Sequence, residues 1–356
     1  LSGGFTTIIT QPRDNNFKVI DGGENVGGAV GYNLGNLTGT YNINTLIRGT
    51  NYVGGFIGYN GKGGLEISGY TNVSQVSGNN YVGGIVGGTY ATLTIKNSNN
   101  NATITGYGYV GGILGGCNDT SVAIIGCHNS GEVNVTGGNV GGILGYTNGN
   151  CKIDIKNCYN NGLVKSTGTA GNVGGIIGRA YTLSTDASAI KIFNCYNVGE
   201  VSNANSDSAG GIVGYARSES AGVVVVKYCY NKAKISGETY IGGIVGSIYT
   251  GKYATIENCY TTVDGTNTIT ATGSNVTTIG AIIGGAFASP YSTSNFNVIN
   301  SWGFYSDATV LGGHNTGMDR FGAYVLVEGF GKKVYPIIDD AIDTDSVSYT
   351  HLRAHE

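Results

Sequence analysis

The sequence predicts an all-β protein, a parallel β-helix (β-solenoid) of about nine coils with roughly three short strands per coil. A glycine-rich segment of the type VGGIVGY recurs nine times, and glycine fills 64 of the 356 positions. Between the copies lies a second repeated element with aliphatic residues and cysteine. Within it, apolar and polar residues alternate with the period of a half-buried strand, which excludes a helix.

The glycine-rich copies define the repeat length. They start 27 to 38 residues apart, at Asn25, Tyr52, Tyr81, Tyr109, Asn139, Asn172, Ser208, Tyr240 and Thr278. Propeller repeats are longer, at about 40 to 50 residues, and leucine-rich repeats need leucines and a helical half. Short strands gain partners when equivalent coils stack above and below. Two explanations for the paired glycines stay open. Either these positions need a positive φ, or the neighbouring backbone approaches too closely for a side chain.

The second element reads NCYNNG, NCYNVG, YCYNKA and NCYTTV in its clearest copies. Its cysteine position is held in turn by Thr40, Tyr70, Ser98, Cys127, Cys158, Cys195, Cys229, Cys259 and Ser301. Six places later stand Leu46, Val76, Ile104, Val133, Val164, Val201 and Ile235. Ile155 and Cys158 can both face inward only if the chain turns between them. Asn157, Asn194 and Asn258 stand there, and asparagine tolerates the left-handed conformation of a corner.

The repeat divides the chain into four parts. Residues 1–24 are expected to form a partial N-terminal coil or edge, and residues 25–300 the solenoid. Residues 301–340 are expected to cap it, because an open end exposes unpaired strand edges. Residues 341–356 are expected to be a disordered, non-native tail, since VSYTHLRAHE resembles the adapter-derived ends of reading frames assembled from metagenomic reads. The chain begins with Leu1 and its only methionine is Met318, so we expect a fragment of a larger polypeptide.

These motifs resemble the GLUG motif array of large bacterial surface proteins, over roughly Asn25 to Ile338 and including the closing VYPII. The resemblance implies a β-solenoid stalk or adhesive segment that a bacterium exports to its surface or surroundings. Similar repeats flank the zinc protease domain of bacterial immunoglobulin A proteases. No HExxH signature occurs here, so protease activity does not carry over.

We therefore expect a non-catalytic structural or adhesive segment, with a host glycan or a matrix protein as its partner. One alternative is a carbohydrate-active β-helix enzyme, a lyase or hydrolase with acidic residues in one groove; another is the accessory solenoid arm of a surface protease. The acidic residues Asp154, Glu200, Glu257 and Asp264 fall in unrelated repeat positions, and Arg179 and Arg217 stand isolated. A net charge of −3 gives no reason to bind nucleic acid. No apolar run approaches the ~20 residues of a membrane span, so no insertion is expected.

Two sets of residues share one repeat position each. Cys127, Cys158, Cys195, Cys229 and Cys259 are expected to form a ladder of small buried thiols, with Cys117 and Cys151 outside it. The next position holds His128, Tyr159, Tyr196, Tyr230 and Tyr260, an aromatic column that either contacts a ligand or stacks only on itself. Tyr32, Tyr59, Tyr146 and Tyr215 form a second, interrupted column. No catalytic residue, cofactor or metal site is expected, because the glycine segments lack the Walker lysine and no Cys/His cluster appears.

Overall fold

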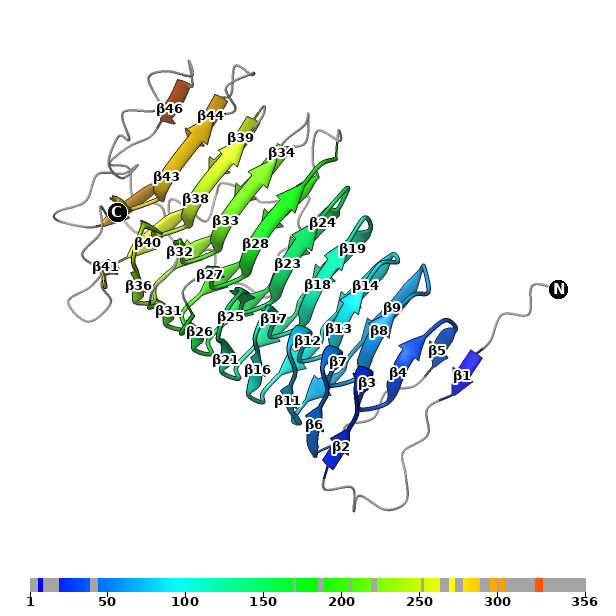
Figure 1. Ribbon diagram of the computed structural model, residues 1–356. Coiled ribbons are helices and arrows are strands. Elements are labelled where there is room, and N and C mark those ends of the chain that lie inside the picture. Colours follow the sequence, from blue (N-terminus) through cyan, green and yellow to red (C-terminus); the bar gives the residue numbers. More distant parts are fainter. Residues whose placement is uncertain are drawn as a thin grey trace, which may run out of the picture.

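The fold is a rod of stacked turns, built from strands (Figure 1). The computed structural model describes residues 6–8, 19–38, 44–168, 171–184, 189–204, 207–218, 223–250, 253–262, 269–272, 278–288, 295–299, 301–304 and 324–328. Every element in these residues is a strand, and they contain no helix that could cross a membrane. All strand pairs are parallel, for example β14 (Leu93–Lys96) with β19 (Ser121–Ile125). The predicted parallel β-solenoid is confirmed.

Apart from β1 (Thr6–Ile8) and β5 (Asn36–Thr38), which pair only with each other, the strands belong to five stacked sheets, numbered here in the order in which a turn visits them. Sheet 1 contains β3 (Glu24–Gly27), β7 (Asn51–Gly54), β12 (Asn80–Gly83), β17 (Tyr109–Gly111), β22 (Asn139–Gly141), β27 (Asn172–Gly174), β32 (Ser208–Gly210), β37 (Tyr240–Gly242) and β42 (Thr278–Gly280). Sheet 2 contains β4 (Val30–Asn33), β8 (Ile57–Asn60), β13 (Val86–Thr89), β18 (Leu114–Asn118), β23 (Leu144–Asn148), β28 (Ile177–Thr182), β33 (Val213–Ser218), β38 (Val245–Thr250) and β43 (Ile283–Ala288).

The other three sheets complete each turn. Sheet 3 contains β9 (Leu65–Ser68), β14, β19, β24 (Lys152–Lys156), β29 (Ile190–Phe193), β34 (Val223–Lys227), β39 (Tyr253–Glu257), β44 (Asn295–Ile299) and β46 (Tyr324–Glu328). Sheet 4 contains β10 (Thr71–Asn72), β15 (Asn99–Asn100), β20 (His128–Asn129), β25 (Tyr159–Asn160), β30 (Tyr196–Asn197), β35 (Tyr230–Asn231), β40 (Tyr260–Thr262) and β45 (Trp302–Phe304). Sheet 5 contains β2 (Val19–Asp21), β6 (Leu46–Arg48), β11 (Gln75–Ser77), β16 (Ile104–Gly106), β21 (Val133–Val135), β26 (Val164–Ser166), β31 (Val201–Asn203), β36 (Ile235–Gly237) and β41 (Ile269–Ala271).

Seven consecutive turns, from β7 to β41, contain all five strands in the described residues, and incomplete turns flank them at each end. The prediction of roughly three strands per turn was too low. Each glycine-rich segment supplies two strands, and the residues after the cysteine position form a separate strand as short as two residues. Such a strand is too short for any alternation of apolar and polar residues to reveal it.

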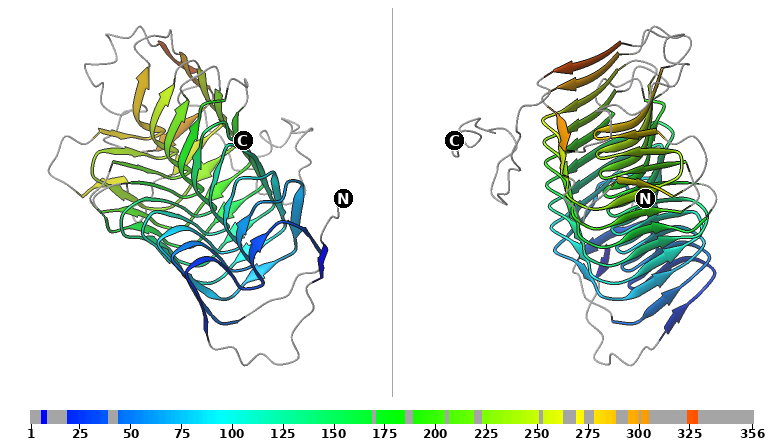
Figure 2. Two further views of the ribbon diagram at one scale, coloured as in Figure 1. Left: turned by 45° about the vertical axis from the view of Figure 1, so that its right-hand side comes forward. Right: turned by 90° about the vertical axis from the view of Figure 1, so that its left-hand side faces the viewer.

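The turns lie in vertical register, so equivalent residues stack along the rod (Figure 2). Val53 pairs with Val82, which pairs in turn with Val110. One predicted column needs a correction: Ile47, and not Leu46, pairs with Val76. Ile47 is fully buried, whereas Leu46 is partly exposed, because a shift of one residue moves a side chain to the opposite face of a strand.

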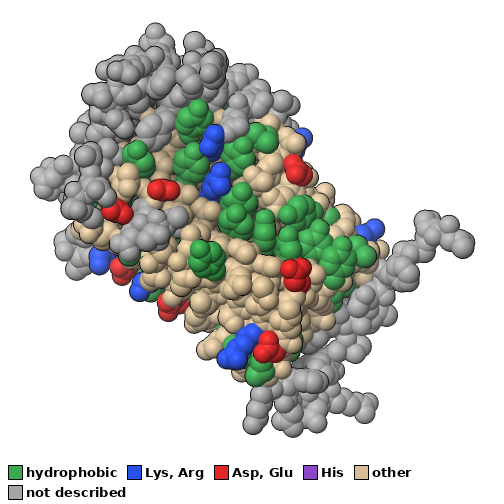
Figure 3. All heavy atoms as spheres, viewed as in Figure 1, with side chains coloured by type: hydrophobic (Ala, Val, Ile, Leu, Met, Phe, Trp, Pro, Cys, Tyr) green, Lys and Arg blue, Asp and Glu red, His purple; other side chains and the backbone are tan. Residues whose placement is uncertain are grey.

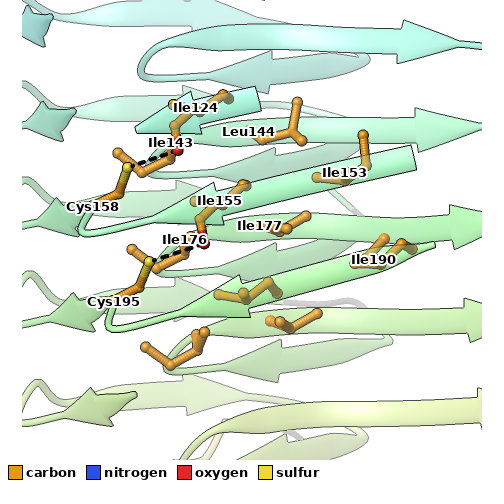
Figure 4. Close-up of a cluster of buried hydrophobic side chains, with 14 of the residues drawn as sticks. Ile124, Ile143, Leu144, Ile153, Ile155, Cys158, Ile176, Ile177, Ile190 and Cys195 are labelled. Carbon is orange, nitrogen blue, oxygen red and sulfur yellow. Dashed lines mark hydrogen bonds between the residues drawn. The ribbon is translucent and has the colours of Figure 1, made fainter. Parts of the chain in front are cut away.

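Two separate apolar cores run along the rod. The larger lies between sheets 2 and 3, where aliphatic side chains pack with the cysteines (Figure 4). The smaller consists mainly of valine and isoleucine side chains from sheets 1 and 5. Nearly all of these side chains are less than 3 % exposed. This continuous burial is the main source of stability for coils that cannot fold singly.

The paired glycines permit close backbone approach. A Cβ on Gly141 would meet the carbonyl oxygen of Leu144, and one on Gly142 would meet that of Gly175 in the next turn. The described glycines with positive φ are Gly64, Gly69, Gly126, Gly149 and Gly171, and none of them belongs to a VGG pair. Of the two explanations left open by the sequence, close approach is therefore the correct one.

The corner asparagines adopt the left-handed conformation that the sequence predicts. The φ angles are 54° at Asn157, 49° at Asn194 and 52° at Asn258. Tyr228 occupies the same corner with a φ of 55°, and Gly126 with 63°. The corner thus needs a positive φ, which asparagine and glycine supply at the lowest cost.

The described residues cover only part of the two predicted end regions. Near the N-terminus, β1 (Thr6–Ile8) pairs with β5 (Asn36–Thr38), and β2 begins sheet 5. In the predicted cap, β45 extends sheet 4 and β46 extends sheet 3. The remainder of the cap and the predicted tail, residues 341–356, lie outside the described residues, as do Thr40 and Asp264.

Candidate functional site

The five cysteines of the predicted ladder lie one above another, buried at the corner between sheets 3 and 4. Cys158 Sγ donates to the carbonyl oxygen of Lys156 at 3.2 Å. It also donates to the carbonyl oxygen of Ile124 in the preceding turn, at 3.4 Å (Figure 4). The same sulfur accepts from the backbone N–H of Cys127 at 3.4 Å. Burial raises the pKa of Cys158, so the thiol stays protonated and can donate.

Serine makes the same contacts where it replaces cysteine. Ser98 Oγ donates to the Lys96 carbonyl oxygen at 2.7 Å and accepts from the N–H of Tyr70 at 3.1 Å. Ser301 acts likewise toward Ile299 and Cys259. Serine and cysteine thus fill this position with a small side chain that both donates and accepts a hydrogen bond, which is a structural role. Tyr70 is the exception, a buried ring whose hydroxyl donates to the Gly55 carbonyl oxygen at 3.0 Å.

Cys117 and Cys151 form a second thiol contact away from the ladder. Their sulfur atoms lie 3.6 Å apart, and both side chains are fully buried. Cys151 Sγ also lies 2.8 Å from the carbonyl oxygen of Asn148. All seven cysteines are free thiols in this structure.

The aromatic column on sheet 4 is a continuous stack of rings. The centroids of successive rings lie 4.7 Å apart for His128 and Tyr159, 4.8 Å for Tyr159 and Tyr196, 4.9 Å for Tyr196 and Tyr230, and 5.1 Å for Tyr230 and Tyr260. The planes of successive rings differ by 2° to 14°. Because the rings stack face to face, their edges and not their faces point to solvent. Tyr230 and Tyr260 are moreover 7 % and 3 % exposed. Sugar rings pack against aromatic faces, so this column offers a ligand little surface.

The second aromatic column is part of a larger surface, which we name the Tyr–Arg stripe. It runs over sheets 1 and 2 and the ends of their strands. Its members are Tyr32, Tyr52, Tyr59, Tyr81, Tyr90, Tyr109, Tyr146, Arg179, Tyr181, Tyr215, Arg217 and Tyr249. Figure 3 views this face, where apolar side chains, tyrosine included, form a band along the rod with basic side chains among them.

The rings of the stripe meet at varied angles. Tyr52 stacks on Tyr81 at 4.8 Å but meets Tyr59 edge-on, with the planes at 78°. Tyr81 meets Tyr109 at 60°, and Tyr109 stacks on Tyr146 at 4.1 Å. Tilted rings leave parts of their faces open. The side chains of Tyr32 and Tyr90 are 52 % and 45 % exposed.

The two arginines lie among tyrosines on adjacent strands of sheet 2. Arg179 pairs in register with Tyr215, and Arg217 with Tyr181. The Arg179 guanidinium carbon lies 5.3 Å from the ring centre of Tyr146 and 5.1 Å from that of Tyr181. For Arg217 the separations are 5.5 Å to Tyr181 and 5.0 Å to Tyr249. Both guanidinium groups are thus within the range of a cation–π contact.

Each described acidic residue that the sequence analysis weighed for a carbohydrate-active enzyme forms an ion pair with a lysine. The nitrogen–oxygen distances are 3.1 Å for Asp154 with Lys156, 3.4 Å for Glu200 with Lys234 and 2.6 Å for Glu257 with Lys227. In the described part of the chain, no three His, Cys, Asp or Glu side chains gather as metal ligands would. Asp154 lines a shallow depression on sheet 3 beside Lys152 and Lys191, where its charge is balanced.

The sequence pattern predicts only part of the stripe. The predicted second column contributes Tyr32, Tyr59, Tyr146 and Tyr215 to the stripe. The stripe also contains Arg179 and Arg217, which the sequence analysis describes as isolated. Tyr52, Tyr81 and Tyr109 were missed, although each is the first residue of a YVGG segment. The pattern also does not predict Tyr90, Tyr181 and Tyr249. Tyr181 and Tyr249 stand two residues further along their strands than the position of the second column, and therefore on the same face of the strand.

Comparisons with known proteins agree with the repeat architecture. Residues 237–270 match the family model of the GLUG motif. The match covers one turn, from the end of β36 into β41, and this turn pairs in register with its neighbours. No curated protein and no solved structure matches the chain. The chain is a GLUG-motif β-solenoid repeat protein.

Proposed function

We propose that this chain is a non-catalytic, structural and adhesive segment of an exported bacterial surface protein, whose rigid aromatic face contacts host glycan or matrix. The observation that carries the proposal is the Tyr–Arg stripe, a linear array of partly open rings held by strands in vertical register. A linear polymer meets at least one tyrosine ring on each turn from β4 to β38. Tyrosine rings supply apolar faces for sugars, and their hydroxyl groups supply hydrogen bonds.

The rigidity of the surface supports this role. Successive turns under the stripe are joined by backbone hydrogen bonds, also at the bends between strands, such as Ile85 N–H to the Ile113 carbonyl oxygen at 3.0 Å. A preformed surface loses little conformational entropy on binding. The same stiffness suits a spacer that holds another domain away from the cell.

The test is a binding screen of the full chain on immobilised glycans and matrix proteins. We expect binding to at least one of them, and a clear weakening by Tyr32→Ala with Tyr90→Ala. Tyr107→Ala is the matched control, because Tyr107 is 60 % exposed and makes none of the ring contacts of the stripe. No binding to any member of the panel would contradict the adhesive role.

The enzyme alternative is tested on the same panel. A carbohydrate-active β-helix would release reducing ends or unsaturated sugars from a polysaccharide. We expect no release, since the described carboxylates Asp154, Glu200 and Glu257 are each held by a lysine. Release that Asp154→Asn or Glu257→Gln abolishes would contradict the non-catalytic proposal.

A further inference from the structure

Cys117 and Cys151 stand at two unrelated repeat positions, yet their sulfur atoms meet. Cys117 lies in β18, in register between Thr89 and Thr147 of the neighbouring turns. Cys151 follows β23 in the next turn, at the position that Thr120 holds in the turn before. Neither position holds a second cysteine in these adjacent turns. The repeat itself therefore does not explain why two cysteines lie in contact.

The side chain of Cys117 has a different partner from the threonines at its position. The hydroxyl groups of Thr89 and Thr147 donate to backbone carbonyl oxygens at 2.7 Å and 2.8 Å. Each ladder cysteine likewise donates to the carbonyl oxygen two residues before it. For Cys117 Sγ, the only hydrogen-bond partner among the described residues is Cys151 Sγ, at 3.6 Å. This thiol is thus directed at a second thiol.

The hydrogen bond between the two thiols makes them chemically unequal. The S–H of Cys117 donates to Cys151 Sγ, which lowers the pKa of Cys151 and raises the pKa of Cys117. The nucleophile in thiol–disulfide exchange is the thiolate. With glutathione disulfide as the oxidant, the Cys151 thiolate attacks one of its sulfur atoms and releases one glutathione. Cys117 then loses its proton and attacks Cys151 Sγ, which releases the second glutathione. Two protein thiols are oxidised and one small disulfide is reduced.

We propose that Cys117 and Cys151 form a disulfide bond that joins two adjacent central turns of the rod. The sulfur atoms must approach by about 1.5 Å, from van der Waals contact to bonding distance. Cys151 lies in the connection between β23 and β24, and a connecting segment shifts more readily than a paired strand. Both side chains are fully buried, so the oxidation occurs during folding, while these turns are still open. The finished bond is then shielded from reductants.

The five ladder cysteines stay reduced under the same conditions. They occupy equivalent positions on stacked turns, so their side chains point in parallel, which is a poor geometry for a disulfide bond. The cross-link needs no ligand and goes beyond the proposed adhesive function. Export, as proposed above, would supply the oxidising surroundings in which such bonds persist.

The first arm of the experiment locates the bond. The full chain is unfolded with a reductant in urea, refolded in a glutathione redox buffer, denatured again and alkylated. We expect five of the seven cysteines to be alkylated. A protease that cleaves after acidic residues places Cys117, Cys127 and Cys151 on separate peptides, so mass spectrometry without reduction identifies the joined pair. Alkylation of all seven cysteines, or a disulfide bond between ladder cysteines instead, overturns the inference.

The second arm measures what the bond does. Oxidative refolding is expected to raise the melting temperature by about 5 °C over the reduced chain, because the bond joins residues 34 positions apart. Cys117→Thr, which introduces the residue of both neighbouring turns, is expected to abolish this difference. Cys127→Ser is the matched control and should retain it, since Ser98 shows that serine fits the ladder. Circular dichroism checks that both variants fold. An equal difference in Cys117→Thr overturns the inference; neither arm measures glycan binding, so the adhesive function is decided separately.

Discussion

At the scale of single residues, a column of buried asparagines joins the turns between the two apolar cores. Each side chain donates to the next one along the rod, through Asn72, Asn100, Asn129, Asn160, Asn197, Asn231 and Thr261. The second N–H of Asn160 donates to the Gly162 carbonyl oxygen at 2.8 Å, closing the corner behind it. A fully buried amide needs these partners, since each unmet hydrogen bond in the interior costs free energy.

We predict that Asn160→Ala lowers the free energy of unfolding by about 2 kcal/mol, the cost typical of buried groups left unsatisfied. Asn197 Oδ1 would lose its donor, and Asn129 Nδ2 would lose its acceptor. Urea unfolding followed by circular dichroism measures the change. Asn161→Ala is the control, because Asn161 is the exposed neighbour and only its backbone N–H is used, toward Asn129. Equal effects of the two substitutions would contradict a special role for the column.

His128 gives the aromatic column a pH-sensitive end. Burial lowers its pKa below 6.5, which means that the folded state favours the neutral ring. Its contribution to stability is therefore fully present above pH 6.5 and lost as the pH falls through the lower folded value. We predict an imidazole titration below pH 6.5 by NMR, and a smaller loss of stability on acidification in His128→Tyr. A titration above pH 6.5 would indicate instead that stacking on Tyr159 favours the imidazolium.

At the scale of the element, the glycine pair sets how closely consecutive turns approach. A Cβ on Gly142 would meet the Gly175 carbonyl oxygen and the side chain of Asn160, both held by the stacked turns. We predict that Gly142→Ala lowers the free energy of unfolding by about 3 kcal/mol, at the upper end for overpacking, because backbone must move. Urea unfolding measures it. Gly63→Ala is the control: nothing lies within 4 Å of a Cβ at Gly63, so no loss is expected there.

The sequence predicts those elements whose side chains repeat in type. The parallel stack followed from the recurrence of aliphatic positions, and the corners at Asn157 and Asn194 from the tolerance of asparagine for positive φ. The division into five sheets did not follow, because strands such as β25 are two residues long. The Tyr–Arg stripe was only partly predictable. Tyr52 and Tyr59 occupy different repeat positions, and their contact depends on how the chain turns at the glycines between them.

At the scale of the whole molecule, stability depends on contacts between neighbouring turns and rises toward the middle of the rod. Each inner turn has a partner on both sides, whereas a terminal turn has only one. We predict that amide hydrogen exchange is slowest in the central turns, around β19 to β29, and faster toward β4 and β42. Mass spectrometry of peptic fragments measures this. Uniform protection along the chain would show instead that the rod unfolds as one cooperative unit.

The tyrosines make the whole rod sensitive to alkali. Burial raises the pKa of Tyr146 to about 12, and it also raises the pKa values of Tyr215, Tyr230 and Tyr260 above 10. Because the folded state holds these protons more tightly than the unfolded chain, their contribution to stability is complete below pH 10 and is lost as the pH rises through the folded values. We predict that tyrosine ionisation, followed by ultraviolet absorbance, coincides with loss of the β-sheet circular dichroism signal above pH 10. In Tyr230→Phe one fewer proton is released, so the transition should depend less steeply on pH. Complete ionisation near pH 10 with the sheet signal intact would contradict this prediction, because it would require the stacked rings to lose their protons without the turns coming apart.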